Sequence, residues 1–231
     1  AAKFGPDGTQ IWSQVYNGTI FPGGLNSNEA ANDFAVGDSG NLYVVGNNQG
    51  VVGGQNAFLI KLNGTTGALQ LSATMNGNLN SADAFYGVAY DSGNMGVYVT
   101  GVETQTIGSG NLVVKKYNVG GALQWTRTES GPGSLGDSGR GISIHASGDL
   151  IVTGQKMIAA GNARGWLMRM PANGGASLWS AEFNGNVNNS VTIGRRVSQV
   201  ANPASMSYVV GTVMTSIGNQ DGYIGQFDNG T

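Results

Sequence analysis

The chain has no cysteine, only one histidine, His145, and few charged residues, at 10% of its 231 positions. Without cysteine, neither a disulfide framework nor a thiolate metal site can form. With a single histidine, a zinc site built from several imidazoles is excluded as well. The sequence therefore predicts no bound metal and no cofactor.

Basic runs and long apolar segments are also missing. The 11 Lys and Arg residues are outnumbered by 13 Asp and Glu residues, which gives a net charge of −2. This balance disfavours nucleic acid and anionic membranes as partners, because both are bound by concentrated positive charge. No apolar stretch approaches the ~20 residues of a membrane-spanning helix. We therefore expect neither nucleic-acid binding nor membrane insertion.

Glycine, by contrast, is abundant, with 40 residues, and some of these glycines mark a repeat. The phrases "LYVVG", "VYVTG", "LIVTG" and "SYVVG" end at Gly46, Gly101, Gly154 and Gly211, which are 55, 53 and 57 residues apart. A fixed period of this size usually determines the whole fold.

Each repeat holds four short segments rich in Val, Ile, Tyr and Trp, separated by Gly, Asn, Asp and Ser. These are strand and hairpin signals, and no helical stripe of apolar residues is present. The pattern predicts an all-β fold, a β-propeller of four-stranded antiparallel blades. We expect a single domain over residues 1–231, with blades at approximately 32–77, 84–131, 139–185 and 194–227, the last completed by 9–18.

The two ends of the chain leave closure of the ring open. The last repeat lacks its tryptophan segment, whereas "TQIWSQVY" from Thr9 is such a segment. We expect the N-terminal strand to complete the fourth blade, which would hide two sheet edges. However, "AAKF" and "GQFDNGT" are both copies of the end of a third strand. A part of a larger propeller or assembly would produce the same overlap.

The repeats resemble a known family at "KLNGTTGALQ", at "GISIHASGDLIVTG" and at the tryptophans of the last segments. They are similar to the beta-propeller repeats of bacterial exported proteins, in which "GIAVD"-type and "YVTG" segments precede "FxxKxNxxGxxxW". The resemblance covers essentially the whole chain. It implies an extracellular or cell-surface location, with the "GIAVD" strand lining a central channel and the tryptophan strand outermost.

Residues that could carry catalysis are few. His145 lies beside the "ASGD" turn, which is typical of a structural polar residue. Asp83 and Asp137 precede inner strands, with Asp33 nearby and Thr192 in the fourth repeat. Such aspartates either accept backbone N–H groups in turns or converge as an acid–base pair of the kind that glycoside hydrolysis needs. We expect the structural role, and we predict no catalytic residue.

A binding cluster is predicted from position. Tyr86, Arg140 and Arg195 occupy related places near the beginning of successive inner strands, and Arg196 is adjacent. Three arginines at one channel mouth would attract an anionic group, and tyrosine would offer a stacking face. Alternatively, each arginine pairs with Asp137 or another local acid, or lies in solvent without a binding role.

Other aromatic and asparagine residues are predicted to be structural. Trp12, Trp125 and Trp179, with Leu71 at the matching place, should plug between blades, and Trp166 should lie in the core. Asparagine–glycine favours hairpin turns, so we expect turn roles for the glycosylation-type sequons at Asn17, Asn63, Asn188 and Asn229.

We therefore expect a non-catalytic secreted or cell-surface propeller that acts as a binding or extracellular-assembly module. Its partner would be a protein or glycan, an anionic one included, and self-association is open. The alternatives are a carbohydrate-active enzyme and a glycan-binding lectin that use the channel mouth. A lectin should repeat its pocket in most blades, but the loops "NNQGVVGGQ", "VETQTIGSG", "QKMIAAGNAR" and "TVMTSIGNQD" diverge.

Overall fold

The computed structural model describes residues 1–21, 24–50, 54–77, 81–106, 109–132, 136–184, 191–199, 206–216 and 219–228. Most of these residues lie in β-strands, and their only helices are the single 3₁₀ turns η1 (Gly18–Ile20) and η2 (Asp38–Gly40). The all-β prediction is confirmed.

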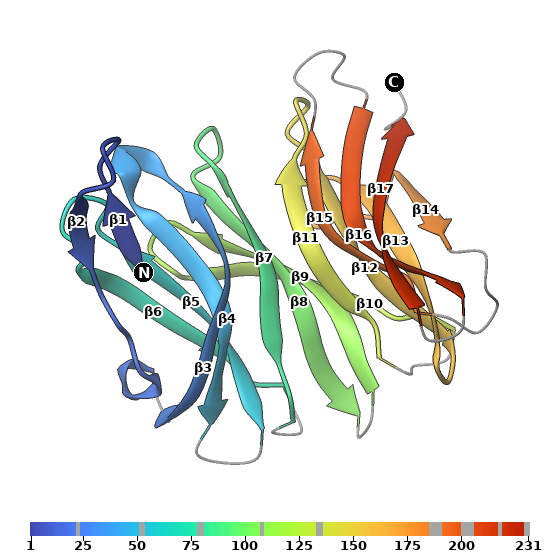
Figure 1. The fold of residues 1–231 in the computed structure, drawn as a ribbon, viewed down its shortest axis with the longest axis horizontal. Helices are drawn as coiled ribbons and strands as arrows, with labels where there is room; N and C mark the ends of the chain where they lie inside the picture. Colours follow the sequence, from blue (N-terminus) through green and yellow to red (C-terminus); the bar gives the residue numbers. More distant parts are fainter. Residues whose placement is uncertain are drawn as a thin grey trace.

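Four antiparallel sheets follow one another along the chain as the blades of a propeller, and within each sheet the strands pair in chain order (Figure 1). Blade 1 contains β3 (Gly24–Val36), β4 (Leu42–Gly50), β5 (Gln55–Leu62) and β6 (Leu69–Met75). Blade 2 contains β7 (Ala84–Asp91), β8 (Gly96–Thr106), β9 (Ser109–Asn118) and β10 (Leu123–Glu129). Blade 3 contains β11 (Ser138–Ile144), β12 (Leu150–Ala159), β13 (Asn162–Met170) and β14 (Trp179–Phe183). Blade 4 contains β15 (Ile193–Gln199), β16 (Met206–Ser216) and β17 (Asn219–Asp228).

The core lies between successive blades. We call the side of a blade that faces the following blade its leading face, and the opposite side its trailing face. Between blades 1 and 2, for example, Tyr43 and Val45 of the blade 1 leading face pack against Val97 and Val99 of the blade 2 trailing face. The alternation of a β-strand places every second residue on the same side, so apolar residues on both sides let each blade pack on two neighbours.

The predicted closure by the N-terminal strand is wrong. β2 (Gln10–Ser13), which carries Trp12, pairs with β1 (Ala2–Phe4) in a separate two-stranded sheet, and β17 has only β16 as a partner among the described strands. This hairpin lies against blade 1 at the left of Figure 1, whereas β17 lies at the right. The Trp12 indole Nε1 donates to the carbonyl of Gly64 at 3.3 Å, and Lys3 Nζ donates to the same oxygen at 2.8 Å. These contacts hold the hairpin on blade 1.

Trp12 contacts blade 1 in the way that each outer strand contacts the next blade. The Trp125 indole on β10 donates to the carbonyl of Ala172 in blade 3 at 3.2 Å, and Leu71 on β6 lies against Gly121 of blade 2. Trp179 packs on the core between blades 3 and 4, and Trp166 is buried between blades 2 and 3. The predicted packing roles are confirmed for Leu71, Trp125, Trp166 and Trp179, whereas Trp12 packs on blade 1 from a separate hairpin and not between two blades.

The sequon asparagines that the structure describes cap turns. Asn63 Oδ1 accepts from the amides of Thr65 and Thr66, and Asn17 Oδ1 accepts from the amide of Thr19. Asn188 and Asn229 lie outside the described residues.

Candidate functional site

Every inner strand carries one β-bulge at the same place. The register with the second strand skips one residue in each blade: Asn32 in β3, Tyr86 in β7, Arg140 in β11 and Arg195 in β15. A bulge leaves its extra residue out of the hydrogen-bonded ladder and re-aims the side chain. Each blade therefore offers one side chain that does not follow the ordinary alternation.

The recurring glycines make room for these bulges. Gly101 pairs with Phe85, next to the bulged Tyr86, and a Cβ on Gly101 would collide with the carbonyl oxygen of Ala84. The same collision with an inner-strand carbonyl occurs at the other recurring glycines: Gly46 with Ala30, Gly154 with Ser138 and Gly211 with Ile193. The repeated "YVTG" phrase thus ends in glycine because any side chain there would displace the inner strand.

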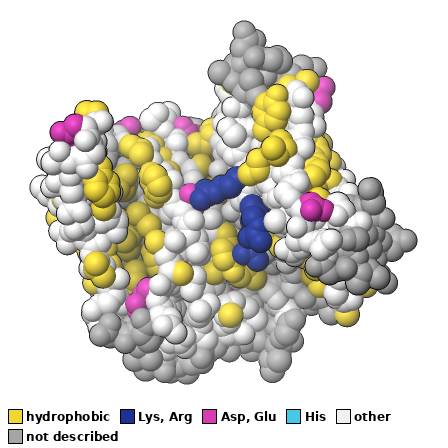
Figure 2. Space-filling model, in the orientation of Figure 1, with side chains coloured by type: hydrophobic (Ala, Val, Ile, Leu, Met, Phe, Trp, Pro, Cys, Tyr) yellow, Lys and Arg dark blue, Asp and Glu magenta, His cyan; other side chains and the backbone are white. Residues whose placement is uncertain are grey.

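The bulged residues come together in one cavity of about 290 Å³, which we call the mouth; it is lined by Asn32, Tyr86, Arg140, Arg195 and Arg196. Basic side chains gather near the centre of the face shown in Figure 2. The four residues predicted from the sequence therefore converge. Asn32 was not among the predicted residues; the strand pairing shows that it is the bulged residue of blade 1, as Tyr86 is of blade 2.

Arg140 is held in place by blade 2 and by its own strand, β11. Its guanidinium lies 3.9 Å from the centre of the Tyr86 ring, and its Nε donates to Ser138 Oγ at 3.1 Å. Burial lowers the pKa of Arg140, and the nearby positive charge of Arg195 lowers it further, against an opposing effect of Tyr86. Arginine nonetheless stays protonated at neutral pH. The mouth thus holds a fixed cation that a bound anion would stabilise.

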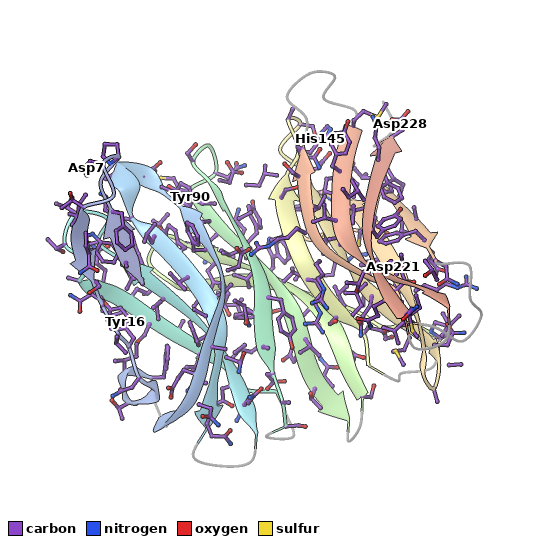
Figure 3. The ribbon with its side chains drawn as sticks, in the orientation of Figure 1. Asp7, Tyr16, Tyr90, His145, Asp221 and Asp228 are labelled. Atoms are coloured by element: carbon purple, nitrogen blue, oxygen red, sulfur yellow. The ribbon has the colours of Figure 1, made fainter. Side chains whose placement is uncertain are left out.

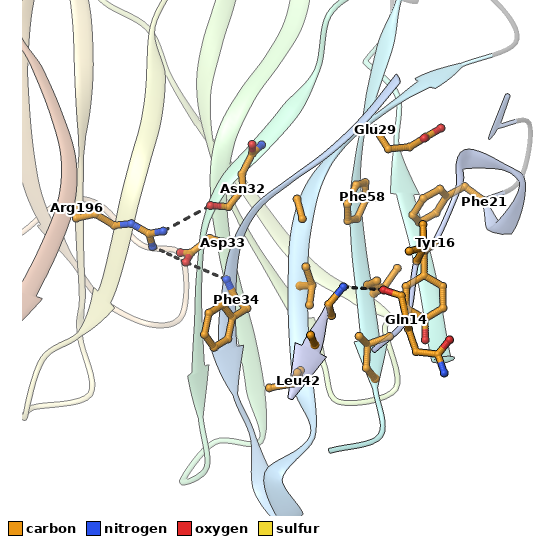
Figure 4. Close-up of a pocket in the computed structure, with 17 residues that line it drawn as sticks. Gln14, Tyr16, Phe21, Glu29, Asn32, Asp33, Phe34, Leu42, Phe58 and Arg196 are labelled. Carbon is orange, nitrogen blue, oxygen red and sulfur yellow. Dashed lines mark hydrogen bonds and ion pairs between the residues drawn. The ribbon is translucent and has the colours of Figure 1, made fainter. Parts of the chain in front are cut away.

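Arg196 crosses from blade 4 to blade 1. It forms an ion pair with Asp33, and its Nη2 donates to the carbonyl of Asn32 at 3.5 Å (Figure 4). Asp33 also accepts from the amides of Phe34 at 2.9 Å and Val88 at 3.1 Å. Pairing with a local acid was one predicted alternative, and it holds for Arg196, although the partner is Asp33 and not Asp137.

Arg140 and Arg195 form no ion pair within the described part of the chain. Arg195 is also exposed to solvent. The mouth therefore contains three guanidinium groups and a single carboxylate at its edge, that of Asp33, which leaves it with excess positive charge.

Asp83 and Asp137 do not contribute to the mouth chemistry. Asp83 is fully buried, and its carboxylate accepts from the amides of Gly77 and Thr104, at 2.5 and 2.7 Å. Asp137 accepts from the amides of Gly131 and Met157 in the same arrangement. Each aspartate thus ties the end of one blade to the second strand of the next. These contacts confirm the predicted structural role, and neither aspartate lines the mouth.

His145 belongs to a turn. Its Nδ1 accepts from the amide of Ser147 at 3.1 Å, and its own amide donates to the carbonyl of Asp149 at 2.8 Å. Figure 3 places it at the end of β11, away from the centre of the face. Within the described residues, no group of three His, Cys, Asp or Glu side chains could hold a metal ion, and no helix is long and apolar enough to cross a bilayer.

A second, larger hollow of about 570 Å³ lies on the trailing face of blade 1, beneath the N-terminal segment (Figure 4). We call it the apolar cleft. Its lining includes Tyr16, Phe34, Leu42, Val44 and Phe58.

No family model matches the chain, and no curated protein matches it. The resemblance to exported propeller repeats stays a prediction.

Proposed function

We propose that the chain is a non-catalytic β-propeller, secreted or displayed at a cell surface, that acts as a binding or extracellular-assembly module. Its mouth holds an anionic group of a protein or glycan partner. The observation that carries the proposal is the convergence of Arg140 and Arg195 on one cavity of about 290 Å³, where neither forms an ion pair with any described acidic residue. The secreted location is supported only by the resemblance of the repeats.

The side chains suit a carboxylate. Guanidinium groups bind carboxylates through paired N–H donors, and such charge-assisted bonds are stronger than neutral ones. Arg140 is oriented in advance by the Tyr86 ring, so less freedom is lost when it binds. The cavity is at the small end of the range for ligand sites. It therefore fits one acidic unit, such as a uronic acid residue or the carboxylate end of a peptide, and not a whole polymer.

The alternatives have less support. Glycoside hydrolysis needs two carboxyl groups on either side of the bond, but Asp83 and Asp137 are committed to backbone amides and Asp33 is paired with Arg196. A lectin with one equivalent pocket per blade would repeat its residues. The bulges instead carry asparagine, tyrosine and two arginines, which supports one asymmetric site.

The test compares acidic with neutral probes by titration calorimetry. The probes are trigalacturonate against a neutral trisaccharide, and a peptide with a free C-terminal carboxylate against its amidated form. Loss of two charge-assisted contacts in the double variant Arg140→Ala, Arg195→Ala should weaken acidic-probe binding by at least about tenfold. Binding to wild type should weaken as salt is added, because exposed charges are screened.

The matched control is Lys116→Ala, Arg164→Ala, which removes the same charge from positions outside the mouth. Equal affinity of the two double variants would show that net charge, and not the mouth, governs binding. A wild-type protein that binds none of the acidic probes would also contradict the proposal.

A further inference from the structure

The leading face of blade 4 is exposed, although the same face is buried in blades 1 to 3. Tyr208 and Val210 are each 43% exposed, and Ile224, which pairs with Val210, is 78% exposed. The corresponding residues of the other blades are at most 2% exposed: Tyr43, Val45 and Leu59; Tyr98, Thr100 and Val114; Ile151, Thr153 and Leu167. Blade 4 therefore presents the apolar side chains of a blade junction with no blade against them.

The trailing face of blade 1 is open in the complementary way. Phe34 is 61% exposed, and Val36 is 60% exposed. The residues at the Phe34 position in the later blades, Val88, Ile142 and Val197, are buried, and each packs against the preceding blade.

The N-terminal segment covers only part of this trailing face. Phe21 stacks on Phe58 with ring centres 4.8 Å apart, and Trp12 covers the turn at Gly64. The part nearer the inner strand stays open as the apolar cleft, which Phe34, Leu42 and Val44 help to line (Figure 4).

We propose that the leading face of blade 4 docks on the trailing face of blade 1 of a second copy of this chain. One chain carries both halves of a blade junction, and every internal junction joins these same two kinds of face. Within one molecule the two faces do not cover each other, since Phe34 and Ile224 are both exposed while Arg196 reaches Asp33. A second copy therefore brings the complementary surface that each open face lacks.

This contact joins two different surfaces, so it is a head-to-tail interface. It rests on the assembly part of the proposed function, and it can fail while anion binding holds, because Arg140 and Arg195 take no part in it. The contact is apolar, so we expect it to persist in salt that weakens binding at the mouth.

Sedimentation velocity across the micromolar range tests the proposal. Wild type should shift from monomer toward dimer or longer assemblies as its concentration rises. Phe34→Asp and Ile224→Asp each place a charge in the contact, and each should weaken association by at least about tenfold. Both positions are exposed, so the fold should remain, which circular dichroism can verify. Leu123→Asp, at a 51% exposed apolar residue outside both faces, should associate like wild type.

Mixing the two aspartate variants gives the sharpest result. The Ile224 face of the Phe34→Asp chain is intact and can dock on the intact Phe34 face of the Ile224→Asp chain, so a one-to-one mixture should recover a dimer. A wild-type protein that stays monomeric throughout, variants that associate like wild type, or a mixture that stays monomeric would each overturn the proposal.

Discussion

Blades 2 and 3 meet in a different way from blades 4 and 1. In the middle of the molecule, the residues after the bulges are Gly87 and Gly141, and a Cβ on Gly87 would lie 3.1 Å from the Cα of Gly141. The two inner strands are therefore in backbone contact. At the same place in the repeat, blades 1 and 4 carry Asp33 and Arg196, which meet through an ion pair between side chains.

The two contacts differ in the residue after the bulge and in how far the apolar faces are covered. Between blades 2 and 3, the position after the bulge is glycine on both sides and the apolar faces are covered. Where the first and last blades face each other, the same position carries charge, and the apolar faces stay exposed. The exposed apolar faces therefore lie on the two end blades, whereas the mouth takes side chains from all four blades.

The largest expected effect is on stability, and it comes from removing an apolar side chain from a buried blade face. Leu167→Ala removes a fully buried side chain between blades 3 and 4 and should cost about 2–5 kcal/mol of unfolding free energy. Ile224→Ala, at the same repeat position in blade 4, should change the stability of the monomer by less than about 0.5 kcal/mol. Urea denaturation at low protein concentration measures both. Similar losses for the two variants would mean that the blade 4 face is covered in solution.

A smaller loss of unfolding free energy is expected when the glycine that faces a bulge is replaced. Gly101→Ala places a methyl group against the backbone carbonyl of Ala84 and should cost about 1–3 kcal/mol. Gly222→Ala in blade 4 is the matched control, because nothing lies within 4 Å of its added Cβ. If both variants melted at the same temperature, the recurring glycines would not be required by the inner strands.

The smallest effect concerns tyrosines at one repeat position. The Tyr98 hydroxyl is buried without a hydrogen-bond partner in the described part of the chain, and burial raises its pKa to about 12. The folded protein thus holds this proton more tightly than the unfolded chain does. The stability linked to it is complete below about pH 10 and is lost as the pH rises toward 12.

Tyr98→Phe removes the buried hydroxyl that has no described partner. At pH 7 its unfolding free energy should therefore equal that of wild type or exceed it by up to about 1 kcal/mol. It should also lose less stability than wild type between about pH 10 and 12. Tyr208→Phe changes the exposed counterpart in blade 4. Its unfolding free energy should equal that of wild type at pH 7 and across the alkaline range. A steeper alkaline loss in Tyr98→Phe than in wild type would contradict this reading.

The blades and most of the mouth could be predicted because their signal is repetition. Gly101 and its counterparts recur because the bulge needs them, and Arg140 and Arg195 recur because they occupy the bulge itself. Asn32 was not predicted because it is neither charged nor aromatic, unlike Tyr86, Arg140 and Arg195 at the same place in the other blades. A bulge shifts the register of a strand pair by one residue, and only the strand pairing reveals where the bulge lies.

Closure of the ring and the open faces could not be predicted in the same way. The strand around Trp12 would fit beside β17 by pattern, but β1 repeats the end of the third strand, and Trp12 binds the Gly64 turn of blade 1 instead. Likewise, Phe34 and Val88 occupy the same apolar position in the repeat. The sequence alone cannot tell that one is exposed and the other buried, because burial depends on which blade lies opposite.

Whether the four bulges build an anion-binding mouth is tested most directly by one titration. The dissociation constant of the acidic probe that wild type binds is measured for wild type and for Arg195→Ala, each at low and at physiological salt. We expect Arg195→Ala to bind about tenfold more weakly at low salt and to depend less on salt, because the variant removes an exposed guanidinium that lines the mouth. Unchanged affinity and unchanged salt dependence would contradict a binding role for the mouth.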